Sequence, residues 1–145
     1  MAAIRETQAY WQQLSAYRRR HDTLLALFDG FFRNASLLAA SGYPVAGITV
    51  TQDSPISFTA RFVDREVNFT LRYRHEPSSG VVEVRDVSVG TDPSKQPIWS
   101  FQFNGQGVVA DIDARVSEGS YNVGVDTDAA EIVLAAIYKT VDPAA

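Results

Sequence analysis

The chain has 145 residues, a net charge of −4 and no cysteine, and its length suits one domain, residues 1–145, with its own hydrophobic core. Without cysteine there can be no disulfide, no thiolate nucleophile and no cysteine-ligated metal. No apolar run approaches the roughly 18 residues needed to span a bilayer, and no secretion signal is visible at the N-terminus. We therefore expect a cytoplasmic protein that makes no contact with a membrane.

Charge is distributed unevenly along the chain. Residues 1–74 carry nine arginines against six acids, a net charge of +3, whereas residues 75–145 carry four bases against eleven acids, a net charge of −7. Such an asymmetry favours self-association if the two halves form separate surfaces. The simpler interpretation is that the fold interleaves the two halves and the imbalance vanishes.

Residues 1–41 are expected to form a long helical segment. Residues 3–40 contain no proline, and their only glycine is Gly30. At 100° per residue, one apolar stripe comprises Ile4, Trp11, Leu14, Leu25, Phe28 and Phe32. Gly42 and Pro44 would end the helix. A helix of this length could also be kinked or split near Asp22 or at Asp29-Gly30.

Residues 45–116 are expected to form the sheet. Apolar and polar residues alternate in this region, which is typical of strands with one buried face. The stretch VDRE at 63–66 is short enough for a tight hairpin. A change of phase between Val84 and Val87 predicts a bulge near Arg85-Asp86. Because the connections are short, successive strands should run antiparallel.

The most specific local pattern is WSFQFNGQGVV, in which Asn104-Gly105 favours a hairpin turn. A two-residue turn would place Phe101 opposite Val108. A four-residue turn ending at Gly107 would shift the register by two residues and keep the same faces inward. In both registers the inward face is expected to carry Trp99, Phe101, Phe103, Val108, Ala110, Ile112, Ala114 and Val116.

Residues 126–141 are expected to form the C-terminal helix. Asp128 followed by Glu131 resembles a capping box, and Lys139 suits the last turn. Both predicted helices have apolar stripes, and the sheet has an aromatic face that requires a cover. The predicted class is therefore α+β: a long N-terminal helix, continuous, kinked or split, then an antiparallel meander sheet of about six strands, then the C-terminal helix, with both helices on one face of the sheet.

The stretch RRRHD at 18–22 interrupts the apolar stripe. On the helical wheel Arg18 and His21 fall within the stripe, and the other two arginines point to the opposite side. The arginines therefore make no single basic face, so nucleic acid is not an expected partner. One interpretation is that the helix overhangs the sheet and its first half meets another chain. The alternatives are that Arg18 lays its stem on the core, or that the helix folds back at Asp22 and buries Trp11.

The chain offers few side chains for catalysis. His21 and His75 are the only histidines, and they lie on different predicted elements. The sequence contains no nucleophile elbow, phosphate-binding loop or zinc-protease motif. A serine nucleophile would need one of these histidines beside it. We therefore expect no enzyme activity, no catalytic residue and no cofactor.

Asp111 and Asp113 are the best candidates for chemistry, because they share the outward face of a predicted strand. Two carboxylates at that spacing could hold a divalent cation or act as acid and base. The simpler interpretation is a solvated face whose acids pair with Arg61, Arg72 or Arg74. Metal sites usually need more than two ligands, so no metal is expected.

The leading hypothesis is a non-enzymatic protein-interaction module, of the kind formed by small acidic adaptors, inhibitors, immunity proteins and chaperones. It would act through the N-terminal helix or the polar outer face of the sheet, most simply in a homodimer. The expected interface residues are Trp11, Arg18, His21, Arg72, Arg74, Asp111 and Asp113. One alternative is a small-molecule-binding domain with a cavity lined by Phe58, Phe69, Trp99 and Phe101. A second alternative is a hydrolase or transferase that uses Asp111 and Asp113.

Overall fold

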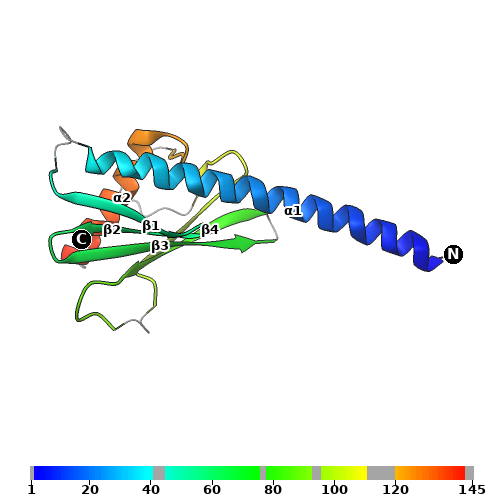
Figure 1. Cartoon of the computed structure of the whole chain (residues 1–145), viewed down its shortest axis with the longest axis horizontal. Coiled ribbons are helices and arrows are strands. Elements are labelled where there is room, and N and C mark those ends of the chain that lie inside the picture. The colour runs from blue at the N-terminus through cyan, green and yellow to red at the C-terminus, as the bar shows by residue number, and fades with distance from the viewer. Residues whose placement is uncertain (1, 41–44, 76–77, 93–95, 111–119, 143–145) are drawn as a thin grey trace.

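The fold is an antiparallel meander of six strands combined with two α-helices (Figure 1). The computed structural model describes residues 2–40, 45–75, 78–92, 96–110 and 120–142. The elements are α1 (Ala2–Ala35), the 3₁₀ helix η1 (Ser36–Ala39), β1 (Ile48–Ser54), β2 (Ser57–Phe62), β3 (Arg65–Arg74), β4 (Ser79–Asp86), β5 (Trp99–Phe103), β6 (Val109–Ala110) and α2 (Asp126–Val141). Each strand pairs with its neighbours in the sequence. The predicted α+β class and antiparallel meander are confirmed.

α1 is one continuous helix from Ala2 to Ala35, so of the alternatives that the sequence left open, the split near Asp22 or at Asp29-Gly30 is wrong. Its 34 residues correspond to about 51 Å at 1.5 Å per residue, against about 17–20 Å for a typical strand. The C-terminal half of α1 lies over the sheet, and the N-terminal half extends beyond it (Figure 1).

The core lies between the two helices and the aromatic face of the sheet. Phe31 of α1 contacts Phe69 and Phe101, with ring centroids 5.8 and 5.9 Å away. Lys139 of α2 lies 5.8 Å from the centre of the Trp99 ring, which shares the buried face of β5 with Phe101. Phe31 of α1 and Lys139 of α2 therefore both contact residues on the buried face of β5.

The turn between β5 and β6 differs from both predicted registers. Phe103 pairs with Val109, which leaves a loop of five residues, 104–108, rather than two or four. The side-chain oxygen of Asn104 accepts hydrogen bonds from two backbone N–H groups of this loop, at 2.9 and 3.1 Å. Gly107 adopts a φ of +83°, a conformation that glycine accepts at no steric cost.

This longer loop reverses the faces of β6. Val109 is buried, whereas Val108 and Ala110 are exposed. The prediction that Val108 and Ala110 point inward was therefore wrong, because an odd shift in register moves every side chain of a strand to the other face. The remaining predicted inward positions, 112, 114 and 116, lie outside the described residues.

The predicted bulge in β4 is also absent. β3 and β4 pair without a break from Val67–Asp86 to Arg74–Ser79. The change of phase that suggested a bulge arises because the strand ends at Asp86. Val87 and Val89 follow it as exposed residues.

α2 spans Asp126–Val141, the range that was predicted, but its capping box is absent. The carboxylate of Asp128 accepts a hydrogen bond from the backbone N–H of Asn122 at 3.0 Å. The carboxylate of Glu131 accepts one from the hydroxyl of Tyr121 at 2.8 Å. These two acids therefore hold the preceding segment against the helix.

The turn between β2 and β3 contains a strained residue. Phe62 pairs with Arg65, which leaves Val63 and Asp64 as a two-residue turn and confirms the tight hairpin. Val63 has a φ of 55°. Positive φ is unfavourable for a β-branched residue, and two-residue hairpin turns prefer glycine at such a position.

Val63→Gly is expected to raise the free energy of unfolding by about 0.5–1 kcal/mol, since the released strain exceeds the entropy that glycine adds to the unfolded chain. Val63 is exposed, so the change removes little packing. Urea denaturation measures the effect. Asp64→Gly, at the neighbouring residue whose φ is not positive, is the control and should lower stability. A Val63→Gly variant less stable than the parent would contradict this account of the turn.

Candidate functional site

The N-terminal half of α1 extends beyond the edge of the sheet (Figure 1), and its apolar side chains there are exposed. We call residues 7–23 of this helix the overhang and residues 24–35 the docked half. In the overhang, every side chain is exposed except those of Ala16 and His21, which are half-buried. Its large apolar side chains have the following exposed fractions: Tyr10 58%, Trp11 69%, Leu14 64% and Tyr17 39%.

The apolar face of the overhang continues the face that covers the sheet. In the docked half, this face consists of buried residues spaced alternately by four and three positions: Leu24, Phe28, Phe31 and Ala35. In the overhang, the same spacing continues with Tyr10, Leu14, Tyr17 and His21. Residues at this spacing lie on one side of a helix. One uninterrupted face of α1 is therefore covered by the protein's own sheet in one half and largely open in the other.

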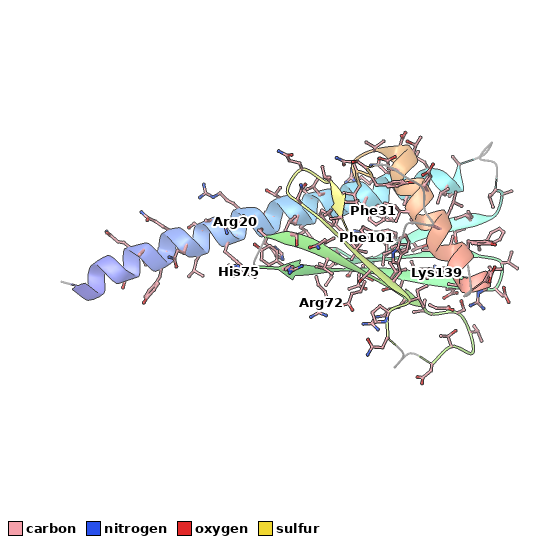
Figure 2. The ribbon with its side chains drawn as sticks, turned by 180° about the vertical axis from the view of Figure 1, so that it is seen from behind. Arg20, Phe31, Arg72, His75, Phe101 and Lys139 are labelled. Carbon is pink, nitrogen blue, oxygen red and sulfur yellow. The ribbon has the colours of Figure 1, made fainter. Side chains whose placement is uncertain are left out.

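An aromatic–histidine cluster, formed by Tyr17, His21, Tyr73 and His75, marks the point where α1 leaves the sheet. Tyr17 packs edge-on against Tyr73, with ring centroids 4.9 Å apart, and lies 5.6 Å from the ring of His75. His21 lies 5.6 Å from the ring of Tyr73. Figure 2 shows Arg20 on α1 and His75 beyond the end of β3 at this junction. The cluster brings together the chain's two histidines and ends the covered part of the helix face.

An open groove with a volume of about 910 Å³ follows the overhang toward this cluster. Its lining includes Ala9, Gln13 and Ala16 on the helix, and Arg20 and His75 at the junction. Each of the two alanines directly precedes a tyrosine of the apolar face, so it lies about 100° around the helix and its short side chain leaves space beside that face. The groove, which the two tyrosines also line, therefore runs along one flank of the open face.

The structure separates the alternatives for the first half of the helix. Trp11 is exposed, so the alternative in which the chain folds back and buries this residue is wrong. The side chain of Arg18 is 85% exposed and its guanidinium lies 3.9 Å from the carboxylate of Asp22, one turn away. Arg18 therefore does not lie on the core, and the overhang is the arrangement that the structure shows.

Two other predicted interface residues lie on the outer face of the sheet, away from the overhang. Arg72 donates a hydrogen bond to the carboxylate of Glu83 at 3.0 Å, and Arg74 donates one to a glutamine side chain of β5 at 3.2 Å. Figure 2 shows Arg72 projecting from the side of the sheet opposite to α1. Asp111 and Asp113 lie outside the described residues. The predicted interface residues therefore do not form one surface.

Polar side chains on the outer face of β1, β2 and β3 bond to one another. The carboxylate of Asp53 accepts hydrogen bonds from Thr59 at 2.6 Å and from the amide of Asn68 at 3.4 Å. The same amide donates to Ser57 at 2.9 Å, and the hydroxyl of Thr70 donates to the amide oxygen of Asn68 at 2.6 Å. A partner at this face would have to replace these internal bonds.

The aromatic residues predicted to line a ligand cavity pack against one another. Phe58 and Phe69 stack with centroids 4.8 Å apart, and Trp99 lies 5.8 Å from Phe101. Phe31 inserts from α1 and contacts the rings of Phe58, Phe69 and Phe101. Phe31 thus occupies the space that a ligand between α1 and these rings would need.

Four residues of the candidate site were missed in the sequence: Tyr10, Tyr17, Tyr73 and His75. The alternating spacing, followed from Leu24 toward the N-terminus, could have identified the first two. No local pattern identifies Tyr73 and His75, because their position depends on where β3 ends relative to α1.

Comparison with known proteins gives no match: no protein-family model, no curated protein and no solved structure matches this chain. Within the described residues, no three or more histidine or carboxylate side chains gather as they would around a metal ion. No helix in that part of the chain is long and apolar enough to cross a membrane. Any assignment must therefore come from the surfaces described above.

Proposed function

We propose that the protein is a non-enzymatic protein-interaction module and that its binding surface is the open apolar face of the overhang. The observation that carries this proposal is the exposure of Tyr10, Leu14 and Tyr17 along one face of the helix, with Trp11 exposed about 60° to the side of Leu14. Single exposed apolar residues are ordinary, but a contiguous group of large ones marks an interaction site. Tyrosine and tryptophan are also enriched among the residues that dominate binding energy.

The spacing of these residues supports recognition through a helix. Tyr10, Leu14 and Tyr17 stand at positions i, i+4 and i+7, the pattern by which an amphipathic helix presents anchors to a partner. Residues 7–17 contain no charged side chain, whereas binding to nucleic acid requires cations that contact phosphates. The lack of cysteine agrees with a reducing compartment such as the cytoplasm, where we place the module.

Site-specific photo-crosslinking in the cells that produce the protein tests this proposal. A benzophenone amino acid in place of Tyr10 should give covalent adducts with a protein partner after irradiation. The same amino acid in place of Gln8 is the matched control, because Gln8 is also exposed but points to the opposite side of the helix. Adducts at position 10 and few at position 8 are expected. Absence of adducts at position 10, or equal yields at both positions, would refute the proposal.

A further inference from the structure

We propose that the partner of the overhang is a second copy of the same chain, and that the two overhangs pair antiparallel about a two-fold axis. This inference rests on the proposed function and specifies the partner of that surface. The two sheets would then lie at opposite ends of the paired helices.

The open face has the spacing of a helix that pairs with a similar helix. Two helices pack along a seam when apolar residues alternate at spacings of three and four. Tyr10, Leu14 and Tyr17 provide this seam, and the adjacent groove at Ala9 and Ala16 leaves room for the large side chains of a partner. A two-fold axis brings the same patch of both chains together, so each chain offers large side chains and the space to receive them.

The charge distribution favours a second copy as the occupant. Residues 7–17 are uncharged and cover about 16 Å of helix. A strongly charged partner finds no complement along this stretch, whereas another copy presents an equally uncharged surface. Arg18, Arg19 and Arg20 follow directly, so the preferred arrangement should keep the two arginine triplets apart.

An antiparallel arrangement separates these charges and a parallel one gathers them. In a parallel pair, six guanidinium groups would lie within about one helical turn of one another. With an antiparallel two-fold axis at the middle of the uncharged stretch, the two triplets would be about 21 Å apart along the helix axis. That separation is more than twice the Debye length of about 8 Å at physiological ionic strength.

The position of the sheet also selects the antiparallel arrangement. The open face of the overhang and the covered face of the docked half lie on the same side of α1. A parallel partner helix seated on the open face would therefore continue into the space that the sheet occupies beyond Tyr17 and His75. An antiparallel partner runs the other way, past the N-terminal end of α1, where the helix projects free of the other elements (Figure 1).

Spin-label distances across the assembly test the pairing. The chain lacks cysteine, so single substitutions at Gln8, Ser15 and Ala26 give uniquely labelled protein. All three residues are exposed and lie within about 20° of one another around the helix, on the side away from the sheet. Light scattering should show a dimer. Double electron–electron resonance should give a distance between Ala26 positions roughly 20–25 Å longer than that between Ser15 positions, since equivalent residues separate along the helix by about 3 Å per residue from the two-fold axis and share the same lateral separation.

Other outcomes would overturn the inference in distinct ways. Equal distances at all three positions would show a parallel pair. A monomer at about 100 μM whose position 10 still forms adducts with another protein would refute self-pairing and leave the proposed function standing. A monomer without such adducts would refute both. Leu14→Glu should weaken the dimer at least about 30-fold, while Ser15→Glu should leave it nearly unchanged.

Discussion

Phe31→Ala is expected to lower the free energy of unfolding by about 3–5 kcal/mol, the range measured when a buried phenylalanine is truncated. Phe31 is fully buried and joins α1 to the sheet by contacting the rings of Phe58, Phe69 and Phe101. Removing its ring leaves these three rings, and that of Phe28, beside a cavity that is only partly refilled, because interiors relax incompletely. Thermal and urea denaturation should both report the loss, with a decrease in Tm of about 10 °C or more.

The matched control is Tyr138→Ala, which truncates an aromatic residue of α2 that is exposed. Such surface changes usually alter stability by about 0.5 kcal/mol or less. Equal melting temperatures for the Phe31→Ala variant and the parent would mean that α1 is not seated on the sheet as described.

Gly80→Ala is expected to cost about 1–3 kcal/mol, the usual range for overpacking a core. A Cβ atom on Gly80 would lie 2.5 Å from the ring of Phe103 and 3.0 Å from the side chain of Leu71. Both neighbours are buried, so neither can move aside without displacing other core atoms. β4 therefore requires glycine at this position because of the ring that crosses it.

Gly105→Ala provides the control for this substitution, because a Cβ atom there would meet nothing within 4 Å. Its unfolding free energy should remain within about 0.5 kcal/mol of the parent value. If urea denaturation gave the same midpoint for both alanine variants, the close approach of Phe103 to β4 would be incorrect.

Features set by local sequence were predictable. Residues 126–141 contain a periodic apolar face and end before Pro143, and α2 has these bounds. The overhang could be anticipated because a helix of nearly 40 residues exceeds the length of any ordinary strand. The meander was also predictable, because the connections between the alternating strands of residues 45–110 are short and successive strands must then run antiparallel.

Features set by particular side-chain bonds were not predictable. Asn104-Gly105 is typical of a two-residue turn, but the side chain of Asn104 and the positive φ of Gly107 build a longer loop. Asp128 and Glu131 match a capping box, yet they bond to the segment before the helix. In both cases the side-chain oxygens accept hydrogen bonds from other nearby donors than the predicted motif would use, and these bonds decide the local structure.

The candidate site likewise contains residues whose position the sequence predicts and residues whose position depends on packing. Trp11 and Arg18 were placed correctly on an open helix, because exposure follows from the excess length of α1. The cluster of Tyr17, Tyr73 and His75 depends on where the end of β3 meets α1. That meeting point is a property of the packed structure and leaves no periodic signal in the sequence.

The docked half of α1 supplies the nucleus from which the helix of the overhang extends. Starting a helix is unfavourable by a factor of about 1,000, and isolated helices shorter than about 12–15 residues are marginal in water. In this chain the turns from Leu24 to Ala35 are fixed by the core, so the helix propagates outward from an existing end. A partner therefore meets a segment that is already ordered, and association avoids the roughly 2–5 kcal/mol that a disordered segment loses in folding on its target. The sheet thus supports recognition indirectly, because it keeps α1 folded beyond the contacts that Tyr73 makes with Tyr17 and His21.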